Sequence, residues 1–243
     1  MYHKSVLSNG IRVISEAMPH LKSVSFGVWV KTGSRNEQDH NHGISHFIEH
    51  LMFKGTESRS AKDIAETVDA VGGQLNAYTG KEHTCYYMKV LDTHLDLAVE
   101  IISDMLRHSK FAPDDIDKER GVVLEEYNMY EDSPDELVHD IYYEKVWPGH
   151  SLGRNILGSI DSIHRFSRDM ICDYTRDFYV PERMVIAAAG NLQHEKLVQL
   201  VEKYFGQIKP GLQEKPQFAP PAEGVRGAAG RYRATCLSHA GRA

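Results

Sequence analysis

Residues 43–54 read GISHFIEHLMFK, and the apolar side chains of this stretch recur at the spacing of an amphipathic helix. They are Ile44, Phe47, Ile48, Leu51 and Met52. His46 and His50 are four residues apart, so on a helix their imidazole rings project from one face about one turn apart. Two nitrogen ligands at this separation suit a tetrahedral zinc ion, so the stretch predicts a helix that carries two metal ligands.

Glu49 precedes the second histidine and would lie beside a bound metal, where its carboxylate could take a proton from water. The order His-x-x-Glu-His inverts the His-Glu-x-x-His order of thermolysin-like proteases. The alternative is a chance match, with odds of roughly a few per cent, that puts two histidines on the surface of an ordinary helix. The apolar stripe beside both rings disfavours it, because unpaired imidazoles in apolar surroundings are costly. His40 and His42 precede the helix and are interpreted as polar loop residues.

A third protein ligand is expected at a zinc site, and a second predicted helix offers carboxylates for it. That helix begins at Pro113, a residue suited to the first helical position. Glu119 and Glu126 are seven residues apart and share one face, whereas Glu125 points about 100° away and is interpreted as a solvated residue. Spacing alone does not choose between Glu119 and Glu126 as the third ligand.

The remaining patterns place strands in pairs with helices between them, which predicts an α+β fold with a largely antiparallel sheet. Strands are predicted around the Asn9-Gly10 turn and at 23–31, 74–79, 83–91 and 183–189. Further helices are predicted at about 60–71, 94–108, 113–130, 134–147, 167–179 and 194–208. A proline-rich composition begins after Ile208, so we expect one domain over residues 1–208 and a linker with an irregular tail over 209–243.

Composition excludes several classes of function. The 243 residues carry a net charge of -6 with 41% hydrophobic residues, so no basic face for nucleic acid is expected. No stretch approaches the roughly 18 apolar residues of a membrane helix, and residues 1–10 have no secretory signal pattern. Three widely spaced cysteines form neither a disulfide framework nor a cysteine zinc site. We therefore expect a reduced, soluble, cytoplasmic protein without nucleic-acid or membrane partners.

The His46–His50 motif and the stretch 119–126, ERGVVLEE, together resemble the pitrilysin and mitochondrial processing peptidase family of inverted zincins. The stretches 43–45, 53–56, 152–158 and 183–191 fit the same family, and the match runs from about Ser5 to Ile208. A family glutamate 76 residues beyond the second histidine completes the zinc site, which selects Glu126. A second glutamate, seven residues earlier, supports catalysis there and matches Glu119. The resemblance thus implies one zinc ion held by His46, His50 and Glu126, with Glu49 as the catalytic base.

The same resemblance gives a role to residues 75–79, LNAYT. The matching family strand lies at the edge of the cleft and binds the substrate backbone, with Asn76 and Ala77 beside the scissile bond. An edge strand offers unpaired N–H and C=O groups to an extended peptide, which explains such binding physically. The alternative is an ordinary sheet strand in which Asn76 caps a turn.

Family members have two homologous halves that close around the peptide, and the second half supplies an arginine and a tyrosine that do not map onto this chain. We therefore predict a zinc-dependent endopeptidase module that cleaves peptides or extended polypeptide segments. The alternatives are a non-autonomous peptide-binding or partner subunit, and a fragment of a full-length two-half peptidase that is inactive alone. The expected partners are a peptide substrate and a homologous second half or partner subunit.

Overall fold

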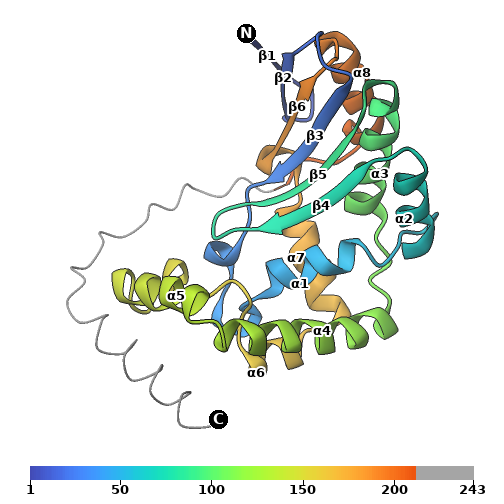
Figure 1. The fold of residues 1–243 in the computed structure, drawn as a ribbon. Helices are drawn as coiled ribbons and strands as arrows, with labels where there is room; N and C mark the ends of the chain where they lie inside the picture. Colours follow the sequence, from blue (N-terminus) through green and yellow to red (C-terminus); the bar gives the residue numbers. More distant parts are fainter. Residues whose placement is uncertain (212–243) are drawn as a thin grey trace.

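The computed structural model describes residues 1–211. Its centre is one six-stranded sheet (Figure 1). The strands are β1 (Tyr2–Val6), β2 (Arg12–Ala17), β3 (Ser23–Val30), β4 (Gln74–Thr79), β5 (Thr84–Leu91) and β6 (Met184–Gly190). Their order across the sheet is β1-β2-β6-β3-β5-β4. In β3, Val24, Phe26, Val28 and Val30 are buried in the core, as the period of two predicts.

The sheet is largely antiparallel, as expected, but it contains one parallel pairing. Strand β6 comes late in the chain and lies between β2 and β3, parallel to β2 and antiparallel to β3. The two predicted hairpins form β1–β2 and β4–β5, both antiparallel. The hairpins depend on neighbouring residues, whereas the place of β6 is set by packing between distant parts of the chain.

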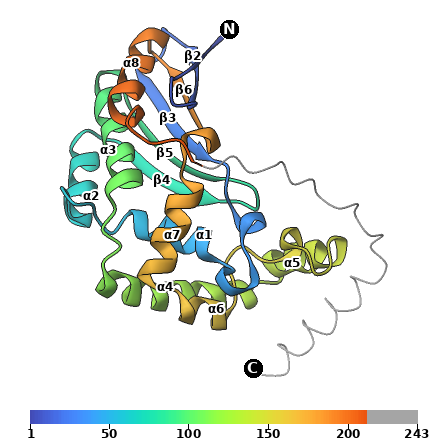
Figure 2. The ribbon, with the colours of Figure 1, turned by 180° about the vertical axis from the view of Figure 1, so that it is seen from behind.

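Eight helices of the described residues cover one face of the sheet and extend beyond one end of it (Figures 1 and 2). They are α1 (Ile44–Met52), α2 (Ala61–Ala70), α3 (Leu95–His108), α4 (Pro113–Glu131), α5 (Pro134–Val146), α6 (Ile160–Arg165), α7 (Arg168–Phe178) and α8 (His194–Phe205). Helices α3, α7 and α8 lie behind the sheet in Figure 1 and in front of it in Figure 2. Helix α3 packs on β3 and β5, and α8 packs on β2 and α3.

Helix α1 packs between the sheet and the long helix α4, with contacts to both α4 and the edge strand β4. This arrangement brings three elements together that are far apart in the sequence. It also explains why α1 is so apolar, because its five predicted apolar residues are all at most 1% exposed. The functional motif therefore lies on a helix that is fixed by the core rather than on a surface loop.

Most predicted elements are present, with two differences. Helix α6 was not expected, because its six residues are too few to show a periodic pattern. The last helix ends at Phe205 instead of Ile208. No helix within residues 1–211 is long and apolar enough to cross a membrane. Most of the linker and tail predicted for 209–243 falls outside the described residues.

Candidate metal centre

Helix α1 presents His46 and Glu49 toward a cleft beside β4 and α4, and His50 lies next to His46. Its start requires a glycine, because Gly43 has φ 90°, and a Cβ there would lie 2.5 Å from the carbonyl oxygen of Leu157. The segment around Leu157 therefore packs directly against the first turn of the helix. His46 follows in that turn and is 8% exposed, while His50 is partly exposed one turn later.

The three predicted ligands meet at one point. His46 Nε2 and His50 Nε2 are 3.2 Å apart, and Glu126 Oε2 lies 3.7 Å from the first and 3.5 Å from the second. Ligand atoms 2.0–2.1 Å from a tetrahedral zinc ion are about 3.3 Å from one another, so this spacing fits the ion. The donor set of two imidazoles and one carboxylate, which leaves a fourth position open, also suits a catalytic zinc site.

Glu126 comes from α4, whose central part lies against α1. Glu119 lies on the same face of α4 seven residues earlier, yet it serves a different contact: its Oε1 accepts a hydrogen bond from His50 Nδ1 at 2.9 Å. Its Oε2 accepts from Lys54 Nζ at 2.6 Å. The contacts thus distinguish Glu119 from Glu126, which spacing alone left equivalent as third ligands. Glu125 is exposed, as expected.

The pKa values of the ligands differ because their surroundings differ. Burial, with help from the charge of His50, lowers the pKa of His46 to about 3, so this imidazole is neutral and its lone pair is available. Burial opposes the charge of His50 too, but the hydrogen bond to Glu119 and the nearby Glu126 and Glu49 raise its pKa. Burial would raise the pKa of Glu119, but its bonds to His50 and Lys54 lower it, so Glu119 is ionised.

Glu49 faces the same cleft as the ligands. Its Oε2 accepts a hydrogen bond from Thr79 Oγ1 of strand β4 at 2.5 Å. Burial raises the pKa of Glu49, and the bond from Thr79 opposes that shift only in part. A carboxylate whose pKa is raised toward neutrality is better matched to proton transfer than an ordinary glutamate.

The cleft has a volume of about 270 Å³ and runs between the ligand helices and the edge of the sheet. Besides His46, Glu49 and Glu126, it is lined by Ala77, Tyr78, Thr79, Tyr130, Asp140, Ile156 and Leu157. Among residues 1–211, strand β4 is the last strand of the sheet and pairs with β5 alone. An edge strand beside the candidate metal ligands is the geometry that addition of a peptide strand requires.

Asn76 and Ala77 lie in this edge strand rather than at a turn. Asn76 Oδ1 accepts a hydrogen bond from the main-chain N–H of Ala77 at 2.8 Å. Ala77 lines the cleft, and Asn76 is exposed. A peptide that pairs with β4 would therefore meet a strand in which one main-chain donor is already held by a side chain.

Sequence reasoning assigned no role to Lys54 and Thr79, although both contact predicted site residues. Lys54 lies two residues beyond the end of α1, and its contact with Glu119 depends on the packing of α1 against α4, so no local signal pointed to it. Thr79 had no such signal either, because its contact with Glu49 depends on how β4 packs against α1. The roles assigned to the site residues stay predictions.

A mixed sheet with helices on one face, joined to a helix-borne pair of imidazoles and a carboxylate from a second helix, defines a candidate site of the inverted zincin type. The chain belongs to the insulinase family of peptidases, M16, because the model of that family matches residues 12–160. A model described as the peptidase M16 inactive domain matches residues 165–229.

Relatives by sequence are described as zinc proteases. The uncharacterized zinc protease YmxG of Bacillus subtilis is 45% identical over 223 residues, which cover 90% of this chain and 54% of the relative. The uncharacterized zinc protease SCO5738 of Streptomyces coelicolor is 43% identical over 219 residues, covering 90% of this chain and 47% of the relative. The chain thus spans about half the length of the curated relatives it matches.

Solved structures agree with the fold. A protease from Helicobacter pylori matches with a TM-score of 0.83 at 27% identity. The match covers 92% of this chain and 54% of the chain of that protease. The first half of the periplasmic protease PqqL from Escherichia coli matches with a TM-score of 0.81. The match covers 90% of this chain and 49% of the chain in that structure. At 22% identity this second likeness concerns the fold alone.

Proposed function

We propose that this chain is the zinc-binding half of a metalloendopeptidase that cleaves extended peptide segments. The observation that carries the proposal is the meeting of His46 Nε2, His50 Nε2 and Glu126 Oε2 within 3.7 Å of one another. Names of relatives as zinc proteases support the choice of metal and reaction. These three residues would hold Zn²⁺, which would supply Lewis-acid chemistry for activating a water molecule and polarising the scissile carbonyl.

The residues of the chain supply the remaining chemistry. Glu49 takes the proton of the attacking water and later gives it to the leaving amine. Thr79 fixes Oε2 of Glu49, so Oε1 is left to meet the water. Glu119 orients the ring of His50 through Nδ1, which keeps Nε2 directed at the cleft.

Strand β4 holds the substrate in this proposal. A peptide in extended conformation pairs with the free edge of β4, and Asn76 and Ala77 lie beside the bond to be cleaved. Because the bonds are made by the peptide backbone, the substrate must be unfolded or locally extended. Side-chain preferences would come from the residues that line the cleft.

The test is the zinc content of the purified chain together with cleavage of an unstructured fluorogenic peptide, with and without a chelator. We expect stoichiometric zinc and chelator-sensitive cleavage. Glu49→Gln keeps the shape of the side chain but removes its basicity, so zinc should stay bound while cleavage falls by about 10²–10⁴-fold. Glu125→Gln on exposed α4 surface is the matched control and should change neither quantity. Full cleavage by Glu49→Gln would contradict the role of Glu49.

A second candidate is a non-autonomous subunit that binds peptide or a partner half. The observation in its favour is length, since the chain covers only 54% and 47% of two relatives. M16 proteases have two homologous halves, and a peptide held by one half alone is less well ordered for cleavage. Stoichiometric zinc without any cleavage would favour this candidate.

A further inference from the structure

Helix α1 begins without a cap of its own. Its N-cap residue, Gly43, has no side chain, and its first turn has no acidic residue. The first N–H groups of a helix have no partner within the helix and need acceptors from elsewhere. At this helix the need matters, because His46 lies in the first turn.

The acceptors come from Glu37, six residues before the N-cap residue Gly43. Its Oε2 accepts a hydrogen bond from the N–H of Gly43 at 2.7 Å, and its Oε1 accepts from the N–H of Ser45 at 2.9 Å. Glu37 is 4% exposed, so both bonds are shielded from water. A negative charge at the N-terminus of a helix also interacts favourably with the helix dipole.

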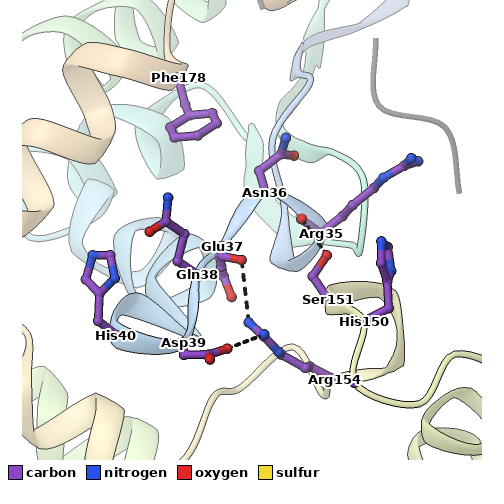
Figure 3. Close-up of a pocket in the computed structure, with 11 residues that line it drawn as sticks. Arg35, Asn36, Glu37, Gln38, Asp39, His40, His150, Ser151, Arg154 and Phe178 are labelled. Atoms are coloured by element: carbon purple, nitrogen blue, oxygen red, sulfur yellow. Dashed lines mark hydrogen bonds and ion pairs between the residues drawn. The ribbon is translucent and has the colours of Figure 1, made fainter. Parts of the chain in front are cut away.

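Glu37 is itself held in place by a neighbouring segment (Figure 3). The guanidinium of Arg154 donates to the main-chain oxygen of Glu37 and forms an ion pair with the exposed Asp39. Ser151 Oγ donates to the main-chain oxygen of Arg35 at 2.7 Å. The turn that carries Glu37 is therefore tied to residues 151–154, beside a polar cavity of about 570 Å³.

The two histidine ligands differ in how their rings are oriented. His50 has Glu119 at its Nδ1, but the buried Nδ1 of His46 has no hydrogen-bond partner in the described part of the chain. Metal-binding histidines are usually oriented by a partner at the second nitrogen. The ring of His46 must therefore be oriented by the position of the helix start and by packing.

We propose that Glu37 is a positioning residue of the metal site: it fixes the first turn of α1 and thereby places His46 Nε2 against His50 and Glu126. This inference rests on the proposed zinc site and goes beyond it. Ser45, whose N–H bonds Glu37, directly precedes His46, so loss of the bond frees the turn that carries the ligand. A second tie, from Ser45 Oγ to Tyr174 Oη at 2.8 Å, limits how far that turn can move.

The experiment measures Zn²⁺ affinity by competition with a chromophoric chelator in the full chain. Glu37→Ala removes both acceptor oxygens. Glu37→Gln keeps the shape of the side chain and one of the two acceptor oxygens. We expect the dissociation constant to rise by about 10–100-fold for Glu37→Ala, as for outer-shell residues of other metal sites, and by less for Glu37→Gln. Glu66→Gln is the matched control, because it removes an exposed carboxylate on α2, away from α1 and from the turn that carries Glu37.

Two further readouts separate positioning from general stability. Hydrogen exchange at the N–H groups of Gly43 and Ser45 should accelerate in the Glu37 variants while exchange in the sheet does not. With Co²⁺ in place of zinc, the visible spectrum of the Glu37→Ala chain should shift toward that of His46→Ala, because coordination by His46 is weakened. A residue that only stabilised the fold would leave the spectrum of the folded, loaded chain unchanged.

The outcomes distinguish this inference from the proposed function. If the unaltered chain binds no zinc, the proposed function fails. If it binds zinc and both Glu37 variants bind it equally well with the same Co²⁺ spectrum, only the role of Glu37 is overturned. An equal loss of affinity in Glu66→Gln would also overturn it. Should Glu37→Ala not fold, Glu37→Gln decides, because it preserves side-chain volume.

Discussion

The imidazoles of His46 and His50, one helical turn apart, differ in burial and in hydrogen bonding. His46 is kept neutral by burial, which lowers its pKa to about 3, and it needs to lose no proton before it binds. His50 is held by Glu119, which in turn is held by Lys54. The chain Lys54–Glu119–His50 couples a half-exposed ammonium group to a ligand atom through a carboxylate that is 3% exposed.

This chain of contacts predicts an effect for a residue that does not touch the metal site directly. Lys54→Met keeps most of the side-chain volume but leaves Oε2 of Glu119 buried without its cation. Glu119 then becomes easier to protonate and a poorer acceptor for His50 Nδ1. We expect zinc affinity to fall about tenfold, the lower end for partners of metal ligands, measured by chelator competition.

Lys62→Met is the control for that variant. Lys62 forms an exposed ion pair with Glu66 on α2, at 3.4 Å, and surface pairs of this kind contribute little. Its zinc affinity should equal that of the unaltered chain. Equal affinities for Lys54→Met and Lys62→Met would show that Glu119 orients His50 without help from Lys54.

Among elements, helix α1 is held at its start by a carboxylate whose own burial is unfavourable. Burial raises the pKa of Glu37 to about 6 from 4.5, although the N–H groups of Gly43 and Ser45 lower it. The folded state therefore binds this proton more tightly than the unfolded state. The contribution of Glu37 to stability is complete below pH 4.5 and is lost as the pH rises through 6.

We expect this loss to appear in the free energy of unfolding of the metal-free chain. Between pH 5 and pH 7 the value for the unaltered chain should fall by about 1 kcal/mol more than that of Glu37→Gln, which has no proton to lose. Denaturant unfolding at both pH values, with chelator present, measures the difference. Parallel pH profiles for the two chains would mean that Glu37 does not titrate in this range.

Elements that depend on local pattern were predictable from the sequence. The hairpins β1–β2 and β4–β5 and the amphipathic helices all appear where periodicity and turn residues predict them. The place of β6 between β2 and β3 was not predictable, because it depends on pairing between segments some 170 residues apart. Spacing put His46 and His50 on one face, but a resemblance was needed to choose Glu126. Glu37 lies outside any helix or motif, so its bonds to α1 had no local signal.

At the scale of the whole molecule, the chain corresponds to about half of each curated relative that it matches. The candidate zinc ligands, the proposed base and the edge strand all lie in the described residues, so this part of the chain contains a complete set of candidate ligands. What it offers to a peptide is an open cleft between strand β4 and the helices that carry the candidate ligands. Metal binding and peptide cleavage are therefore expected to have different requirements.

That difference can be measured by adding the second half of a relative in trans. We expect the chain alone to bind zinc, and its cleavage of a fluorogenic peptide to rise at least tenfold when the second half of the Bacillus subtilis relative is added. The Glu49→Gln chain mixed with the same second half is the control and should stay inactive. A rate that is high alone and unchanged on addition would show that this half is self-sufficient.

The free edge of β4 has a consequence for the protein in its resting state. An open strand edge attracts any extended chain, including the edge of another copy, and such pairing leads toward aggregation. The bond from Ala77 N–H to Asn76 Oδ1 closes one donor of that edge with a group that can rotate away. Self-association between copies is thereby discouraged, while a peptide that fits the whole cleft can displace a single amide. We therefore expect Asn76→Ala to associate with itself more readily at the β4 edge than the unaltered chain does, which gel filtration would measure.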